Sequence, residues 1–121
     1  MIRNIKLSVT TDADGAATAQ ATTPVLGYLE AVEWVDGSLA DGVDATVSVV
    51  STSSGIDQTL LTLTDANDDA FYYPRAIIHN ATGGTVTGEY TEYLVDGYLK
   101  LTVAQGGSVK AGNAIVYVET E

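Results

Sequence analysis

Apolar and polar residues alternate one by one through much of the chain, and this pattern constrains the fold more than any other feature. In IKLSV, residues 5–9, Ile, Leu and Val alternate with Lys and Ser. A two-residue period places successive side chains on opposite faces of a β-strand, whereas no long stretch carries the 3.6-residue period of an amphipathic helix. The pattern recurs near residues 28–35, 43–49, 61–63, 99–103 and 115–119.

Short turn-forming segments rich in Asp, Gly and Ser separate the alternating stretches, for example DADG at 12–15 and VDG at 95–97. Short strands at this spacing are typical of sandwiches and small barrels. We therefore expect an all-β fold: a two-sheet antiparallel β-sandwich, with a jelly roll as one form that it could take, in a single domain over residues 1–121. The segment 37–42 could hold one helical turn. The eight or nine expected strands span residues 2–10, 16–22, 27–36, 43–52, 58–64, 70–79, 85–94, 97–104 and 113–119.

Charge and cysteine content exclude several classes of function. The chain has 16 acidic and 5 basic residues, a net charge of −11. Nucleic-acid binding needs a basic face that neutralises phosphates, and anionic membranes repel an acidic protein, so neither partner is expected. Without cysteine, disulfides, thiolate metal sites and a cysteine nucleophile are excluded. The first residues form no apolar leader, and we expect synthesis in a cytoplasm without a cleaved signal.

The sequence DANDD resembles the start of a calcium-binding loop. Asp65, Asn67 and Asp69 match the first three ligand positions of an EF-hand, D-x-[DN]-x-[DN]. The match then fails, because Ala70 stands where the loop needs Gly and Ala76 where it needs a bidentate Glu. An EF-hand is excluded and no metal site is predicted. An irregular calcium site remains open, with oxygen ligands from Asp65, Asn67, Asp68 and Asp69.

The sequence contains no recognisable catalytic motif. His79 is the only histidine, there is no G-x-S-x-G nucleophile elbow, and no glycine-rich phosphate loop is present. A glycosidase needs two carboxylates in one cleft. Glu30 with Glu33 and Glu89 with Glu92 are close in sequence, but strict alternation places the first two on opposite faces of a strand. We predict no catalytic residue and no cofactor, and a small hydrolase is the least favoured reading.

A consecutive aromatic triplet follows the acidic turn. Phe71, Tyr72 and Tyr73 must project to both faces of a strand, so at least one ring needs cover from a loop, another sheet or another chain. Pro74 cannot donate a ladder hydrogen bond, so the expected strand 70–79 lies at a sheet edge or contains a bulge. The triplet therefore indicates an assembly surface.

Four segments, which span nearly the whole chain, carry a resemblance to a known family. They are VTTDADGAATA, TPVLGYLEAVEWVDGSLADGVDATVSVV, LTDANDDAFYYPR and LKLTVAQGGSVKAGNAIVYV, at residues 9–19, 23–50, 63–75 and 99–118. Their order resembles a family of small virion proteins of tailed bacteriophages. The resemblance implies a head decoration, or cement, protein that forms trimers and binds the major capsid protein on the outer surface of the capsid. The region 80–97 is the least recognisable.

Six residues are expected to make contacts in such an assembly. The basic N-terminal strand could dock on an acidic surface or pair with a neighbour's edge. Arg75 is the single cation in an acidic and aromatic neighbourhood, and an ion pair with Asp65, Asp68 or Asp69 is its alternative role. Two other functions stay open: a carbohydrate-binding or head-fibre module, and a tail or connector component. The expected interface residues are Arg3, Lys6, Phe71, Tyr72, Tyr73 and Arg75.

Overall fold

A computed structural model describes all residues 1–121 and contains ten β-strands and no α-helix. No helix long and apolar enough to cross a membrane is present. The strands are β1 (Ile2–Thr10), β2 (Ala17–Gln20), β3 (Val25–Val35), β4 (Asp44–Ser51), β5 (Asp57–Leu63), β6 (Ala70–Tyr72), β7 (Ala76–His79), β8 (Thr85–Thr91), β9 (Leu94–Ala104) and β10 (Ala111–Glu119).

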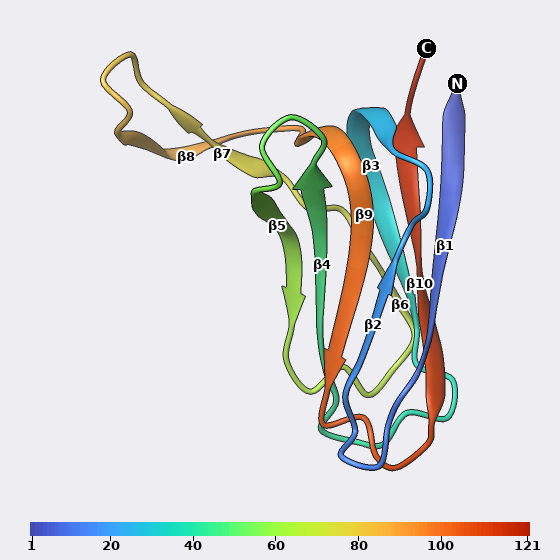
Figure 1. The fold of residues 1–121 in the computed structure, drawn as a ribbon. Coiled ribbons are helices and arrows are strands. Elements are labelled where there is room, and N and C mark those ends of the chain that lie inside the picture. Colours follow the sequence, from blue (N-terminus) through green and yellow to red (C-terminus); the bar gives the residue numbers. More distant parts are fainter.

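Eight strands form a jelly-roll β-sandwich (Figure 1). One layer has the order β1-β10-β3-β6 and the other β2-β9-β4-β5, with all pairs antiparallel. The beginnings of β3 and β9 also pair, which joins the layers into one continuous sheet. Among these eight strands the first pairs with the last, the second with the second to last, and so on to the middle of the chain. The four pairs are β1 with β10, β2 with β9, β3 with β6 and β4 with β5. This nested pairing is that of a jelly roll, so the predicted fold class is confirmed.

The hydrophobic core fills the space between the two layers. It contains 21 buried residues, most of them Val and Leu at alternate positions of the central strands β3, β4, β9 and β10. The largest is Trp34, which is fully buried and donates a hydrogen bond from Nε1 to the carbonyl oxygen of Ala66 at 3.0 Å. The bond satisfies the one polar atom of the indole, so Trp34 fixes the loop after β5 against the core.

A β-bulge in β3 corrects the alternation expected for residues 28–35. The register with β10 shifts between Tyr117 and Val118, which leaves Glu30 as the extra residue of β3. A bulge of this kind reverses the side-chain phase downstream of it. Leu29 before the bulge and Val32 after it are therefore both fully buried, although strict alternation places them on opposite faces.

Three other boundaries differ from the expectation. Pro74 splits the expected strand 70–79 into β6 and β7, and β6 is an edge strand, as the proline predicts. The VDG segment at 95–97 is not a turn but lies inside β9. Residues 37–42 form two turns and no helix. The N–H of Leu39 bonds within the loop, but those of Ser38, Ala40 and Gly42 bond to segments far away in the sequence.

Gly97 marks the point where β9 passes from one layer to the other. It is in register with Val25 of β3 on one side and Ser51 of β4 on the other. A Cβ atom at this position would lie 1.9 Å from the carbonyl oxygen of Val50. The crossing therefore requires glycine, which explains a Gly that resembles a turn signal in the sequence.

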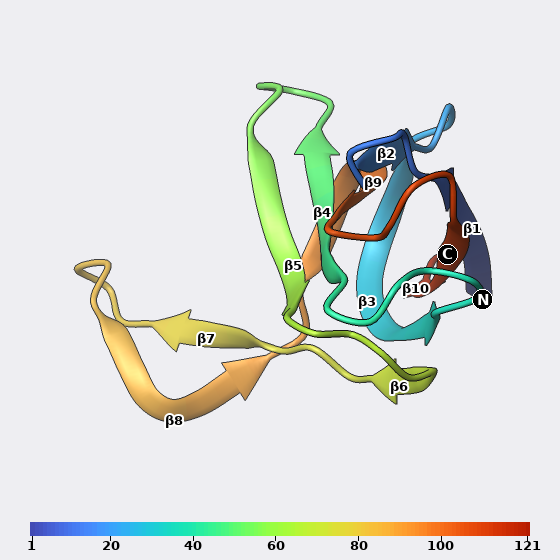
Figure 2. The same ribbon diagram turned by 90° about the horizontal axis from the view of Figure 1, so that it is seen from below.

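The hairpin β7–β8 projects from the sandwich, and we call residues Ala76–Thr91 the arm (Figures 1 and 2). It is inserted between β6 and β9 and forms a separate two-stranded sheet. The two views, at right angles to each other, both show it extending away from the two layers. It covers no part of the core.

Candidate interaction surface

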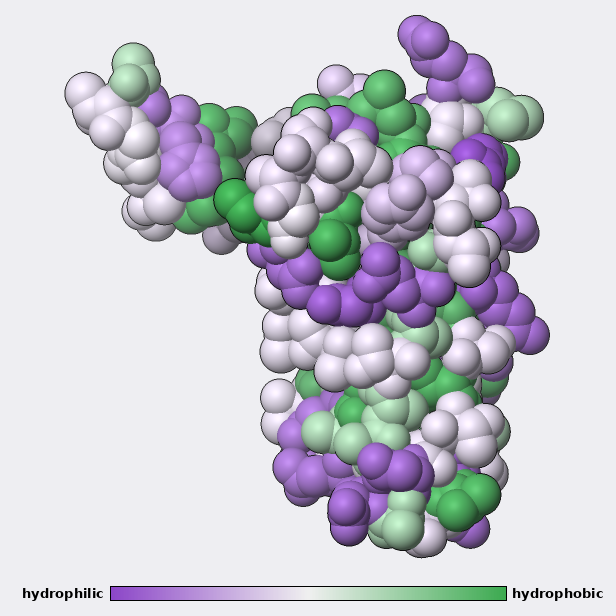
Figure 3. Space-filling view, viewed as in Figure 1, coloured by the Kyte–Doolittle hydropathy of each residue, from purple (hydrophilic) through white to green (hydrophobic).

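The arm is short, nearly uncharged and largely open to solvent. Residues 76–91 contain Glu89 as their only acidic residue and no Lys or Arg, in a chain with a net charge of −11. Ile77 is in register with Tyr90, whose side chain is 59% exposed. Figure 3 shows the arm standing off the body, with hydrophobic surface near the junction. The chain leaves both long edges of this hairpin unpaired.

The tip of the arm is organised by one side chain. Asn80 Oδ1 accepts hydrogen bonds from the backbone N–H of Thr82 at 3.0 Å and of Gly84 at 2.9 Å, and from Thr82 Oγ1 at 2.9 Å. Backbone bonds also join Asn80 to Gly83 and Gly84. This is the turn chemistry that Asn and Gly provide. The tip is preorganised by its own hydrogen bonds, without help from the body.

The base of the arm lies against the bulge of β3. Arg75, directly before β7, donates from Nη1 to the carbonyl oxygens of Pro74 at 2.8 Å and Glu30 at 3.3 Å. On the other side of the arm, the carbonyl oxygen of Tyr93 accepts the N–H of Leu29 at 3.0 Å. Both connections of the arm are thus fixed to the same part of β3. The suggested ion pair of Arg75 with Asp65, Asp68 or Asp69 does not form.

Two carboxyl groups meet at this base. Glu92 directly follows β8, and its half-buried side chain places Oε2 out of solvent with no hydrogen-bond donor. The neighbouring carboxyl is that of the bulged Glu30. A hydrogen bond to Glu92 raises the pKa of Glu30 above its ordinary value, with smaller contributions from desolvation and the charge of Glu92. The two carboxyl groups bond to each other only when one of them holds a proton.

Lys6 and Phe71, two predicted interface residues, lie on one face of the molecule. Lys6 is in register with Ile115, Ile115 with Glu33, and Glu33 with Phe71. Residues in register share a face, so this row crosses the outer face of the β1-β10-β3-β6 layer. Tyr72 points the other way and packs against the core. The triplet therefore does project to both faces, as expected.

Phe71 is an exposed aromatic side chain on that outer face. Its side chain is 55% exposed, and its ring centroid lies 6.3 Å from that of Tyr117, at 36° between planes. The hydroxyl of Tyr117 donates to Glu33 Oε1 at 3.0 Å. This hydrogen bond raises the pKa of Tyr117, with desolvation as the second cause. Tyr73, past the end of β6, is 66% exposed.

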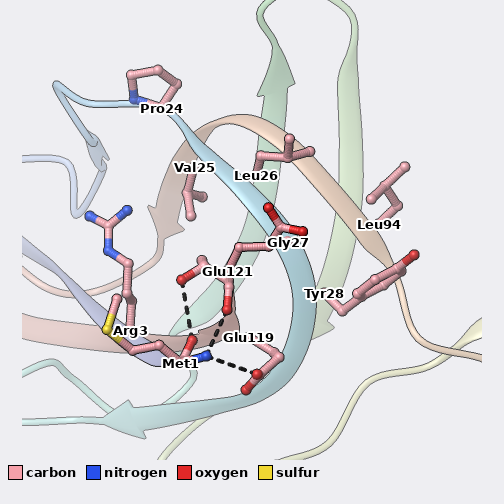
Figure 4. Close-up of a pocket in the computed structure, with 11 residues that line it drawn as sticks. Met1, Arg3, Pro24, Val25, Leu26, Gly27, Tyr28, Leu94, Glu119 and Glu121 are labelled. Atoms are coloured by element: carbon pink, nitrogen blue, oxygen red, sulfur yellow. Dashed lines mark hydrogen bonds and ion pairs between the residues drawn. The ribbon is translucent and has the colours of Figure 1, made fainter.

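Arg3 lies apart from Lys6, on the opposite face of β1, because its position in the strand differs by an odd number of residues. It lines a shallow groove between the end of β10 and the start of β3 (Figure 4). Leu26, Tyr28 and Leu94 contribute apolar surface there, and all three are exposed. The structure therefore does not combine Arg3 and Lys6 into one basic patch.

The acidic turn at residues 65–69 holds the loop after β3 in place through hydrogen bonds, and we call this contact the brace. The N–H of Gly42 donates to Asn67 Oδ1 at 2.7 Å, and the N–H of Asp36 donates to Asp69 Oδ1 at 2.8 Å. Asp65 adopts a positive φ of 51° and donates its N–H to Asp44 Oδ1. No group of three or more His, Cys, Asp or Glu side chains converges as a metal-binding cluster. These contacts give the turn a structural role.

Burial also affects one carboxyl beside this brace. Desolvation raises the pKa of Asp36, and the negative charges of Asp41, Asp69 and Asp68 raise it further. Its Oδ1 is buried without a hydrogen-bond donor. The loop thus keeps a carboxylate in an unfavourable environment at neutral pH.

Neither carboxylate pair considered from the sequence, Glu30 with Glu33 or Glu89 with Glu92, is the one that the fold brings together. The bulge removes the strict alternation that separated Glu30 from Glu33, and Glu30 instead meets Glu92, 62 positions later in the chain. Glu89 lies on the exposed β8. His79 is exposed at the end of β7, in register with Thr85. Sequence spacing cannot reveal the Glu30–Glu92 pair, because the arm inserted between β6 and β9 creates it.

Comparisons with protein-family models, with curated proteins and with solved structures found no match to this chain.

Proposed function

We propose that this protein is a non-enzymatic structural component of a bacteriophage particle, a decoration protein that binds the outer surface of the major capsid lattice. The arm is the observation that carries the proposal. An isolated two-stranded hairpin is only marginally stable in water and gains stability by packing against another surface. In this chain the arm packs on neither layer of the sandwich. A neighbouring molecule in an assembly would supply the missing surface.

The chemistry of the arm suits a protein partner. Its open edges offer unpaired N–H and C=O groups to a further strand, and Ile77 and Tyr90 offer apolar contact area. With one charged residue, Glu89, the arm can approach an acidic surface at little electrostatic cost. Copies of a chain with a net charge of −11 repel one another through their bodies. A homo-oligomer, a trimer by preference, would therefore form through nearly neutral elements such as the arm.

The acidic body favours the outside of a shell. Packaged DNA is itself a dense negative charge, and an acidic protein is repelled from it. Jelly rolls are common among viral capsid domains, which agrees with the proposal at the level of architecture. The resemblance of the sequence to small virion proteins of tailed phages points in the same direction.

A glycan-binding module is the second candidate, and Phe71 is the observation that favours it. Its exposed ring lies beside Tyr117 and Glu33, on a face that also carries Asn113, whose Oδ1 has no donor. Jelly rolls also occur among lectins. Retardation of a monomeric protein on immobilised glycans would favour this candidate over the first.

The test of the first candidate uses particles of the encoding phage that lack the protein. Purified protein is added, the particles are sedimented, and bound protein is quantified. We expect the full chain to co-sediment in a saturable way and to raise the temperature at which the particles break. A variant that lacks the arm, with Arg75 joined to Glu92 by Asn-Gly, should remain in the supernatant.

The absence of the protein from purified wild-type particles, by mass spectrometry, would refute the virion role. If the variant without the arm bound the particles as well as the full chain, the virion role would stand, but the arm would not be the part that contacts the capsid. The oligomeric mass of the free protein in solution distinguishes a decoration protein from a tail or connector component. A trimer agrees with decoration, and a ring of higher order agrees with a tail or connector component.

A further inference from the structure

The arm and the groove beside Arg3 are two open surfaces at the same end of the molecule. Leu94, which lines the groove, is the third residue after the arm. We propose that the arm of one copy of this chain lies in the groove of a second copy, so that the copies join head to tail. The inference names the neighbouring molecule that covers the arm, and in that respect it rests on the proposed function.

The arm does not fill the groove of its own chain. Its two connections are fixed to β3 by the hydrogen bond of Arg75 to the carbonyl oxygen of Glu30, at 3.3 Å, and that of Leu29 to the carbonyl oxygen of Tyr93, at 3.0 Å. From these contacts the hairpin extends away from the sandwich in both views (Figures 1 and 2). A single copy therefore leaves both surfaces open.

Both surfaces expose apolar side chains. Leu26, Tyr28 and Leu94 form the apolar side of the groove, and each is more than half exposed. On the arm, Tyr90 is also more than half exposed, and its register partner Ile77 shares its face. Burial of such side chains is the main favourable contribution to protein association. The arm offers them with a single charge, so two acidic chains can meet there with little repulsion.

The one charge of the arm has an opposite charge in the groove. Glu89 precedes Tyr90 in β8, so it projects to the other face of the arm. Arg3 lies across the groove from the apolar side (Figure 4) and forms no ion pair within the chain. Of the two acidic residues in the lining, Glu119 is paired with the N-terminal amine at 2.9 Å, and the other is Glu121. An arm that packs Tyr90 on the apolar side thus directs Glu89 towards Arg3.

The length of the arm agrees with this contact. Strand β8 has seven residues, and a strand rises about 3.3 Å per residue, which gives an arm of about 23 Å. The two layers of a sandwich lie about 10 Å apart, so one arm is long enough to cross the end of a neighbouring sandwich. Because the arm and the groove are different surfaces, the contact is heterologous and closes into a ring where the rotation between copies permits.

Exchange of the two charges tests the contact in the isolated full chain. The mass in solution is measured by sedimentation equilibrium at low ionic strength, without particles. We expect the wild type to be an oligomer, and Arg3→Glu and Glu89→Arg each to weaken association at least about tenfold, because each places like charges opposite one another. The double variant Arg3→Glu/Glu89→Arg restores opposite charges, so its association constant should return to within about threefold of the wild type.

Two further variants separate the charge from the surface that carries it. Lys6→Glu is the matched control, since it makes the same charge change as Arg3→Glu on the same strand but on the opposite face, and it should keep the wild-type mass. Leu26→Ser changes the apolar side without a change of charge. It should weaken association about tenfold, and the folded chain tolerates it because Leu26 is exposed.

A wild type that sediments as a single chain at about 100 μM would overturn the inference. A double variant as weak as the single ones would also overturn it, and so would a Lys6→Glu variant as weak as Arg3→Glu. Particle binding is measured separately. A single chain that still co-sediments with particles removes the arm-to-groove contact and leaves the virion role, whereas an oligomer that is absent from purified particles does the reverse.

Discussion

Single residues decide where the strands of this jelly roll bend, cross and end. Glu30 is the extra residue that reverses the phase of β3, and Pro74 ends β6 before the arm begins. Gly97 allows β9 to pass between β3 and β4, where a side chain would collide with backbone. None of the three is part of the core, yet each determines which neighbour a core strand pairs with.

Gly97→Ala should strongly destabilise the fold. The added Cβ would overlap the carbonyl oxygen of Val50, a backbone atom that can move only if β4 moves. We expect a loss of about 3 kcal/mol in the free energy of unfolding, the upper range for overpacking. Gly55→Ala is the control, since its φ is +74° and nothing lies within 4 Å. It should lose only about 1 kcal/mol, the cost of a left-handed conformation. Equal losses in urea titrations of the two variants would contradict the steric argument.

At the scale of elements, the arm and the sandwich are nearly independent. The arm forms its own sheet, and the core residues all belong to the body or its loops. Ala76 and Thr91 are register partners, so the two ends of the arm are adjacent and a two-residue turn can replace it.

Removal of the arm should therefore leave the sandwich intact. We expect the variant with Asn-Gly in place of residues 76–91 to keep the β-sheet circular dichroism spectrum and the thermal midpoint of the full chain. Burial of apolar area in the core determines global stability, and the arm contributes none of it. A large fall in the midpoint would mean that the arm stabilises the body and is not a free projection.

Strand positions could be predicted well from the sequence, because alternation and turn residues are local signals. Strand β1 has the expected bounds, and most others differ by one to three residues. The bulge at Glu30 could not be predicted, because no residue type or pattern in the local sequence indicates a single extra residue in a strand. The turn expected at 95–97 was wrong, because a glycine required by close approach to β4 looks the same as a turn glycine.

The candidate site was predictable only in part. The proline, the aromatic triplet and Arg75 mark the base of the arm, and these are features of one short segment. The placement of Lys6 beside the row of Phe71, and of Glu92 beside Glu30, depends on strand order. Pairings across many residues leave no signal in local patterns.

At the scale of the whole molecule, negative charge opposes the fold. The net charge of −11 gives a self-repulsion that grows as carboxyl groups ionise. Burial raises the pKa of Asp36, and the bond to Glu92 raises that of Glu30. Both groups contribute stability that is lost as the pH rises through their folded-state pKa values. Asp12 acts in the opposite direction, because the backbone N–H groups of Ala16 and Asp14 lower its pKa.

The free energy of unfolding should therefore fall as the pH rises from about 4 towards neutral at low ionic strength, because the two carboxyl groups with raised pKa values and the overall repulsion both act in this direction, whereas the contribution of Asp12 changes only at lower pH. Urea titrations check this, since urea does not screen charge. Added salt of about 0.5 M should recover part of the loss at the higher pH, because the Debye length falls to a few ångströms. A stability that is independent of salt at the higher pH would contradict this origin.

The nested pairing of the strands has a consequence for how the chain folds. Ile2 is in register with Glu119, so the first strand of the sandwich has no ladder partner until the last has been synthesised. The inner pair β4–β5 is closed by a short loop and can form early. Folding should proceed from the middle of the chain outward, at the slow rates of about milliseconds to seconds that non-local β-topologies show. Until β10 is available, the edge of β1 is free to pair with strands of other molecules. Aggregation is therefore the main risk for this protein while the chain is still being synthesised.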